Sequence, residues 1–126
     1  MSTWEHNLLN DQSRDTVAGV LQPVLADLAA LGLQGKQAHW NVVGERFRSV
    51  HLQLDEVVDL ARNSADEVAE RIVTLGVPSR GNPSQVAEES RLEDYPDGLT
   101  DSSETLQLLA ARLATVASGI REAREV

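Results

Sequence analysis

The sequence predicts an all-α fold in which one domain forms a bundle of long helices. Two observations support this prediction. Apolar residues recur at spacings of three and four along three long segments, which is the pattern of a helix with one buried face. Aromatic residues make up only 3% of the 126 residues, and alanine, leucine and valine dominate the apolar set, which suits helix-on-helix packing better than a β-sandwich.

The first predicted helix spans residues 13–40. Pro23 lies inside it and predicts a kink or an early boundary, because proline cannot donate the helical hydrogen bond. The second predicted helix spans residues 47–75, with Gly76 at the position of a C-terminal cap and Pro78 two residues later. The two apolar stripes consist of Val17, Val20, Leu21, Val24, Leu28 and Leu31 in the first helix, and of Leu54, Val57, Val58, Ala61, Ala65, Val68 and Ile72 in the second.

Residues 76–100 differ in composition and predict a connection, because three of the four prolines fall there. A short helix is expected over residues 84–90, started by Pro83 or Ser84, and residues 94–98 have turn chemistry. The third long helix is expected over residues 101–126, with Asp101 and Glu104 as a capping pair. It reaches the last residue without a stop signal, which indicates a frayed end or a truncated sequence. Its apolar stripe consists of Leu106, Leu109, Leu113, Val116 and Ile120.

The composition excludes several classes of protein. The chain has no cysteine, which rules out disulfides, zinc fingers and thiol catalysis. No apolar run approaches the roughly 20 residues of a membrane span and residues 1–10 show no secretory signal, so we expect a soluble cytoplasmic protein. The net charge of −9 disfavours DNA binding and favours small cations. No nucleophile elbow or Gly-rich phosphate loop is present.

Residues of metal-ligand type lie at helical spacing around His51. With His51 set at 0°, a rotation of about 100° per residue places Asp55 at about 40°, Asp66 at about 60° and Glu70 at about 100°. The four side chains therefore share one stripe that flanks the apolar face of the second helix. His6, in contrast, stands alone in an N-terminal arm and is interpreted as a solvated side chain.

One helix cannot place all four side chains around a single ion. Asp55 and Asp66 are separated by roughly 16 Å along the helix axis, whereas metal–ligand bonds measure about 2 Å. A second copy of the helix, packed antiparallel across a two-fold axis near residues 60–61, would bring His51 and Asp55 of one chain to Asp66 and Glu70 of the other. The same symmetry would create two equivalent sites.

His39 completes the predicted set, because it lies at the end of the first helix on the edge of that helix's apolar stripe. The predicted ligands are His39, His51 and Asp55 from one chain, with Asp66 and Glu70 from its partner. Nitrogen and carboxylate donors suit Fe, Mn or Zn better than Cu(I), and their mixture suits iron redox chemistry. The alternatives are a solvated acidic face or a polar interface, since Asp59 and Arg62 lie on the same stripe.

Three stretches of the sequence resemble one known family. They are KQAHWNVVG (residues 36–44), the pair His51 and Asp55, and ADEVAERI (residues 65–72). Together they form the pattern H-x11-H-x3-D-x10-D-x3-E, which is similar to that of the Dps family, the DNA-binding proteins from starved cells or mini-ferritins. The resemblance extends over most of the chain.

The resemblance implies a ferritin-like four-helix bundle assembled as a hollow shell of twelve subunits. It implies ferroxidase sites at two-fold interfaces, where Fe(II) is oxidised preferentially by hydrogen peroxide and ferric iron is stored, protecting against oxidative damage. The implied iron ligands are His39, His51, Asp55, Asp66 and Glu70. Trp40 matches a family tryptophan near the site, where it would intercept stray oxidising equivalents; the alternative is an anchor packed at a helix end.

The sequence departs from the family in two respects. The family has four long helices and the sequence predicts three, so we expect the fourth helix and the C-terminus to be missing and an apolar seam to be exposed. The expected division is an N-terminal arm (residues 1–12) and a ferritin-like domain (residues 13–126). The first 15 residues contain a single basic residue, Arg14, whereas family members that bind DNA often carry basic tails. DNA binding is therefore unsupported by charge. A nucleoid-binding structural protein and a helical oligomerisation module are the alternatives to a ferroxidase.

Overall fold

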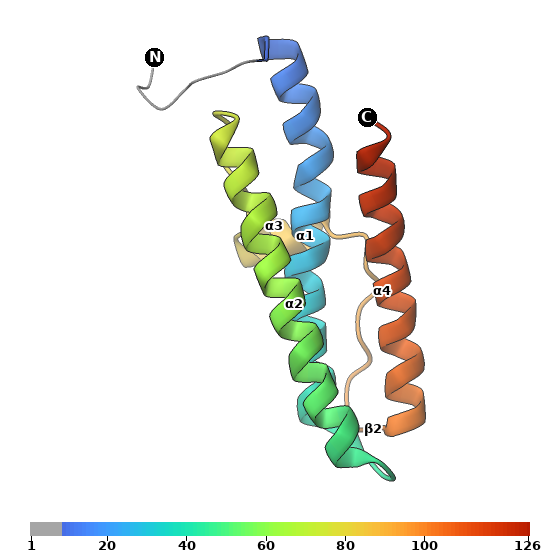
Figure 1. Cartoon of the computed structure of the whole chain (residues 1–126). Helices are drawn as coiled ribbons and strands as arrows, with labels where there is room; N and C mark the ends of the chain where they lie inside the picture. Colours follow the sequence, from blue (N-terminus) through green and yellow to red (C-terminus); the bar gives the residue numbers. More distant parts are fainter. Residues whose placement is uncertain (1–8) are drawn as a thin grey trace.

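The computed structural model describes residues 9–126, which form three long helices and one short one (Figure 1). The long helices α1 (Asp11–Asn41) and α2 (Phe47–Thr74) form an antiparallel hairpin, with the short helix α3 (Pro83–Glu89) behind it and α4 (Ser102–Arg124) against the other side of α1. Two short strands, β1 (Val42–Val43) and β2 (Thr100–Asp101), pair in parallel at the lower end of the bundle. The predicted all-α fold is confirmed, and His6 lies outside the described residues.

Helix α1 is longer than predicted and is not divided at its proline. It begins at Asp11 because the side chain of Asn10 accepts a hydrogen bond from the backbone N–H of Ser13 at 2.8 Å. The helix continues through Pro23 to Asn41, so an early boundary at this proline is wrong. Buried apolar residues on the C-terminal side of Pro23 hold the helix against its neighbours, and this tertiary packing outweighs one missing hydrogen bond.

The other helix ends follow the predicted capping chemistry. Gly76 adopts a positive φ of 89° after α2 and donates its N–H to the carbonyl of Val73 at 2.9 Å. Asp101 precedes α4, and its side chain accepts from the N–H of Glu104 at 2.8 Å. Asn82 caps the N-terminus of helix α3, and Pro83 occupies its first turn. The sequence suggested Pro83 or Ser84 as the residue that starts this helix.

The core lies between α1, α2 and the inner face of α4. The apolar stripe predicted for α2 is confirmed at its centre, where Leu54, Val58 and Ala61 are buried. The largest cluster of buried residues joins the three long helices and consists of Val24, Leu28, Leu31, Ala38, Val42, Val50, Leu54, Ala61, Leu109 and Val116. This packing fixes the α1–α2 hairpin, and the hairpin carries the candidate site.

The prediction for α4 is wrong in part. Of its five apolar stripe residues, only Leu109 and Val116 are buried. The outward line of large apolar residues, at seven-residue intervals, consists of Leu106, Leu113 and Ile120. The buried face of α4 is instead largely polar or small and includes Ser102, Thr105, Arg112 and Gly119. The expected exposed apolar seam is therefore present on α4.

The connection between α3 and α4 is fastened to α1 by an ion pair between the buried Asp27 and the exposed side chain of Arg91. Asp27 is only 1% exposed, and it accepts hydrogen bonds from the backbone N–H of Arg91 at 2.7 Å and from its Nε at 2.9 Å. Gly119 of α4 leaves space for this arginine, because a Cβ at position 119 would overlap the guanidinium. One side chain thus links three separate parts of the chain.

Helix α1 also corrects the expectation about apolar runs. By length and composition alone it could cross a membrane, but in the fold 44% of its most apolar stretch is buried inside the protein. The helix contains three acids, Asp11, Asp15 and Asp27, and Asp27 is buried and paired with Arg91 inside the fold.

Candidate metal centre

The turn between α1 and α2 brings His39 and His51 into direct contact. The Nδ1 atom of His39 lies 2.6 Å from the carbonyl oxygen of His51, and the Nδ1 atom of His51 lies 2.8 Å from the carbonyl oxygen of His39. The two rings are stacked with their centroids 3.6 Å apart and an interplanar angle of 15°. Phe47 extends the stack, with its centroid 5.0 Å from that of His51. The predicted proximity of the two histidines is therefore present in the fold.

These two hydrogen bonds fix which nitrogen of each ring can bind a metal. A carbonyl oxygen only accepts hydrogen bonds, so each Nδ1 must carry the proton and donate it. In the neutral form of each ring, Nε2 then carries a lone pair, and no hydrogen bond to either Nε2 exists within residues 9–126. A backbone carbonyl that orients an imidazole through its other nitrogen is the usual outer-shell support of a metal-binding histidine.

Asp55 lies beside this pair and is held by a lysine. Lys36 of α1 donates to Asp55 Oδ1 at 2.6 Å, and His39 Nδ1 lies 3.6 Å from the same oxygen. The Lys36 hydrogen bond lowers the pKa of Asp55, although partial desolvation acts in the opposite direction; electrostatic interactions with His39, Lys36 and His51 lower it further. The carboxylate is therefore ionised and ready to meet a cation.

Asp66 and Glu70 lie further along α2 and remain exposed. Neither carboxylate forms an ion pair within the described chain. No group of three or more His, Asp or Glu side chains in residues 9–126 is placed to hold a metal ion by itself. The fold thus brings His39, His51 and Asp55 together and leaves the other two predicted ligands at a distance in the same chain.

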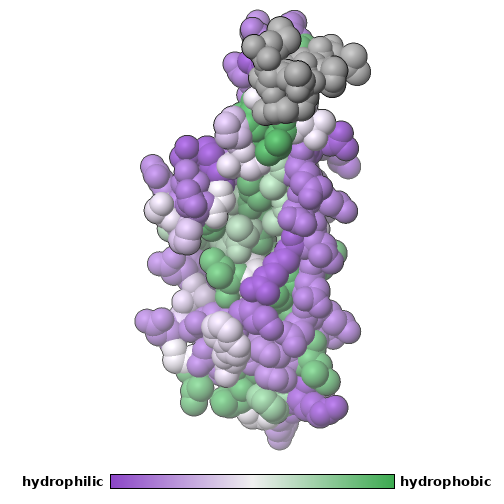
Figure 2. All heavy atoms as spheres, turned by 90° about the vertical axis from the view of Figure 1, so that its left-hand side faces the viewer, coloured by the Kyte–Doolittle hydropathy of each residue, from purple (hydrophilic) through white to green (hydrophobic). Residues whose placement is uncertain are grey.

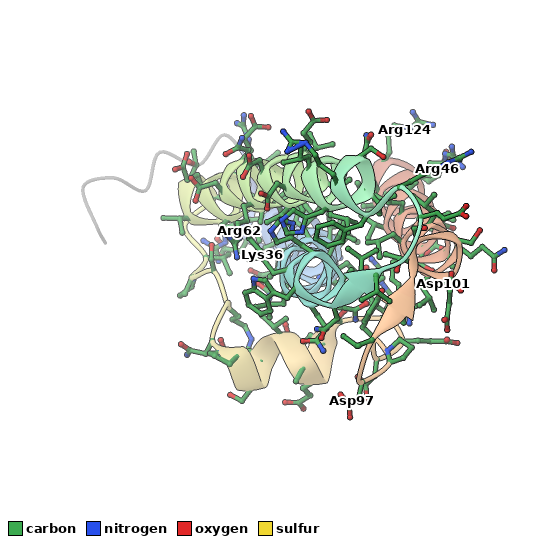
Figure 3. All side chains as sticks on the ribbon, turned by 90° about the horizontal axis from the view of Figure 1, so that it is seen from below. Lys36, Arg46, Arg62, Asp97, Asp101 and Arg124 are labelled. Carbon is green, nitrogen blue, oxygen red and sulfur yellow. The ribbon has the colours of Figure 1, made fainter. Side chains whose placement is uncertain are left out.

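Two residues near the histidine pair, Lys36 and Trp40, add to what the sequence predicted about the site. Lys36 was part of the quoted sequence pattern but was not predicted to touch the site. Its position three residues before His39 on the same helix was the signal that could have identified it. Trp40 is 68% exposed, so within one chain it does not pack as an anchor at the helix end. Figure 3 shows Lys36 beside the α1–α2 boundary, on the flank away from α4.

Comparison with known proteins now identifies the class of fold. The sequence profile of the ferritin-like domain matches residues 19–126. DpsA14 from Streptomyces coelicolor superposes with a TM-score of 0.91 at 36% identity, covering 98% of this chain and 73% of that one. Dps from Microbacterium arborescens in its high iron form superposes with a TM-score of 0.86 at 32% identity, covering 93% and 76%. The protein is therefore a ferritin-like helical protein.

The sequence relatives narrow this class. The chain is 40% identical over 114 residues to a DNA protection during starvation protein of Mycolicibacterium smegmatis, covering 90% of this chain and 60% of the relative. It is 37% identical over 117 residues to the protein of the same name from Agrobacterium fabrum, covering 93% and 72%. The chain belongs to the Dps family. It spans about 60% of the length of the M. smegmatis relative.

Proposed function

We propose that the protein is an iron-sequestering ferroxidase that oxidises Fe(II) with hydrogen peroxide and stores the ferric product. The observation that carries this proposal is the reciprocal histidine pair, in which each Nδ1 is engaged by a carbonyl and each Nε2 is left for a metal, with an Asp55 carboxylate oxygen 3.6 Å from His39 Nδ1. The proposed ligands of the substrate iron are His39, His51 and Asp55, completed by Asp66 and Glu70 of a second chain. Membership of a ferritin-like family and the high iron form of one similar structure support iron as the substrate.

The donor chemistry fits both oxidation states of iron. Imidazole nitrogen is a borderline donor that suits Fe(II) on entry, whereas carboxylate oxygen is a hard donor that favours Fe(III). In the overall reaction, two Fe(II) ions each lose one electron, and one hydrogen peroxide molecule takes up both electrons and two protons to become two water molecules. Both reagents of hydroxyl-radical chemistry are consumed together. The acidic surface, with a net charge of −9, raises the local concentration of Fe(II).

The proposal includes assembly. A two-fold pair of chains is the smallest unit that contains all five ligands, and the full-length family architecture suggests twelve subunits. The names of the relatives, which refer to protection during starvation, support a protective role under stress. A chain without cysteine suits the reducing cytoplasm, where we place the protein. The charge gives no support to DNA binding.

The direct test is peroxide-dependent Fe(II) oxidation by the assembled chain. His51→Ala and Glu70→Ala should each reduce the rate by about 100-fold or more, since each removes a ligand from every site. Glu67→Ala is the matched control, because Glu67 is an exposed acid on the same helix but lies off the stripe. Circular dichroism of each variant confirms that the helices are retained.

Mixing the two damaged chains tests the sharing of the site. In a mixed pair, one site lacks both His51 and Glu70, and the other site is intact. Two inactive proteins should therefore regain activity when they are unfolded together and reassembled. Activity that stays absent in the mixture, although mixed pairs form, would contradict a site shared between chains. Unchanged activity in both single variants would contradict the proposed ligands altogether.

A further inference from the structure

Two charged residues on α2 have no role in the proposed iron chemistry. Asp59 and Arg62 are both exposed and lie on the same stripe as the proposed ligands. Neither side chain has an ion-pair or hydrogen-bond partner within the part of the chain that the structure describes, although each has oppositely charged neighbours along the helix. This pair is available for a contact outside the single chain.

The spacing of the proposed ligands determines where the two residues would lie in a pair of chains. A two-fold axis that places His51 opposite Glu70 and Asp55 opposite Asp66 passes α2 midway between residues 60 and 61. Residues equally far from that point on either side then lie opposite each other. Arg62 and Asp59 meet this condition, each about 2 Å from the axis along the helix. The register that assembles the metal ligands therefore also places Arg62 opposite Asp59 of the partner subunit.

The charge of this helix face favours such a contact. Between His51 and Glu70 the only basic residue is Arg62. The acidic residues of the same stretch that lie on this face are Asp55, Asp59, Asp66 and Glu70. Two such faces repel each other when they meet without metal, and Lys36 is already paired with Asp55 at 2.6 Å. Arg62 is therefore the cation that remains to offset the charge at the centre of the interface.

The structure supports Arg62 in a position to do this. Its side chain lies over Gly32 of α1, where a Cβ would make ordinary van der Waals contact with Arg62 Cγ at 3.4 Å. Seen along the bundle, Arg62 and Lys36 lie on the same flank, away from α4 (Figure 3). Packed helices lie about 8–10 Å apart, a distance that an arginine and an aspartate can span together.

Apolar surface on the same side of the molecule favours a second copy as the occupant. Figure 2 shows the side that lies on the left in Figure 1, where a hydrophobic strip runs between hydrophilic margins. On α2, Leu52 is 48% exposed and Val73 is 44% exposed. The two-fold register places Leu52 opposite Ala69, which is small enough to admit it. In an isologous interface each apolar contact occurs twice, so these side chains add buried apolar area on both sides of the two-fold axis.

We propose that Arg62 and Asp59 form two reciprocal ion pairs with a second copy of this chain and thereby set the register that completes the iron sites. This inference rests on the two-fold arrangement of the proposed function and adds the residues that select it. Guanidinium and carboxylate groups can bond through two parallel hydrogen bonds, which gives direction as well as attraction. Because the two ion pairs are related by the two-fold axis, a single charge reversal in the chain disrupts both pairs in each interface.

Charge reversal tests this proposal without iron. Arg62→Asp and Asp59→Arg should each weaken self-association of the metal-free chain by about 100-fold or more, because each change puts like charges opposite one another twice. The two variants mixed together should associate with each other, since both pairs are then restored in the mixed dimer. The double variant, with the charges exchanged, should self-associate within about threefold of the unaltered chain. Sedimentation velocity and native mass spectrometry measure all four species.

Glu67→Arg is the matched control, since it reverses an exposed acid on the same helix away from the stripe, and it should change self-association little. Single variants that associate normally, or mixed variants that fail to pair while circular dichroism shows intact helices, would overturn the inference. So would an unaltered chain that stays monomeric. If self-association depends on these charges but no Fe(II) is oxidised, the result contradicts the proposed function and supports the proposed interface.

Discussion

The hairpin of α1 and α2 and the helix α4 are stabilised by different kinds of contact. All five residues that α2 buries are apolar: Val50, Leu54, Val58, Ala61 and Ile72. Helix α4 buries Thr105 and Arg112 beside its two apolar residues and turns a line of leucines and an isoleucine outward. The difference teaches that apolar periodicity locates a helix but does not decide which of two adjacent faces its neighbours cover.

The buried arginine of α4 shows how the polar face is accommodated. Arg112 is 7% exposed, and its Nε donates to Gln34 Oε1 at 2.9 Å. Its Nη2 donates to the backbone carbonyl of Asp94 at 2.8 Å, and its guanidinium lies 5.6 Å from the centre of the Tyr95 ring. No buried side-chain nitrogen or oxygen within residues 9–126 lacks a partner. Specific polar contacts thus attach α4 to its neighbours, whereas apolar packing attaches α2 to α1.

The largest expected effect is a difference in the free energy of unfolding between substitutions on the two faces of α4. Leu109 is 4% exposed and Leu113 is 38% exposed. Leu109→Ala should lower the free energy of unfolding by about 2–5 kcal/mol, because it opens a cavity in the core. Leu113→Ala should lower it by less than about 1 kcal/mol. Urea unfolding followed by circular dichroism measures both, and equal losses would mean that the outer face of α4 is packed as well as the inner one.

The next effect tests the ion pair between Asp27 and Arg91 that fastens the connection to α1. Asp27→Ala should cost about 2 kcal/mol of unfolding free energy, because the hydrogen bonds that Ser90 and Arg91 donate to the buried carboxylate are lost. Asp15→Ala, an exposed acid on the same helix, should change stability by less than about 0.5 kcal/mol. The imidazole NMR signals of His39 and His51 should be unaltered in both variants. A shift of those signals with Asp27→Ala would contradict the expectation that the Asp27–Arg91 ion pair is independent of the histidine pair.

The smallest effect concerns Lys36 and Asp55 on the hairpin. Lys36→Met should raise the pKa of Asp55 toward its ordinary value of 3.8, because the main cause of the lowered pKa is removed. With Lys36 present, the ionised carboxylate stabilises the fold above about pH 4, and this contribution is lost as the pH falls through the lowered pKa. The variant should lack that contribution. NMR titration of the Asp55 carboxyl carbon measures the shift, and Lys36→Arg should retain the low pKa.

The sequence was sufficient for some elements for clear physical reasons. The boundaries of α2 follow from a single apolar stripe and a glycine cap, both of which are local features of the chain. The place of His39 beside His51 was expected from its position at the end of the first helix, on the edge of that helix's apolar stripe. The donor types at the site, imidazole and carboxylate, follow from residue identity alone.

Other features depend on contacts between distant residues and could not be predicted. The ladder of β1 and β2 contains two residues per strand, which is too short for any alternating pattern. The stripe of α4 satisfied the helical spacing at all five positions, yet Leu106, Leu113 and Ile120 lie on the uncovered face. The pairing of Lys36 with Asp55 spans nineteen positions in the chain, and only the packing of α1 on α2 reveals it.

The reciprocal bonding of the two imidazoles gives each ring two separate duties. The inner nitrogens fasten the hairpin, because each holds a carbonyl of the opposite helix, and the outer nitrogens stay available for chemistry. Alkylation of an outer nitrogen would block the proposed metal binding and leave the hydrogen bonds of the hairpin intact. Loss of either imidazole ring would leave a carbonyl of the other helix without its hydrogen-bond donor and would destabilise the turn.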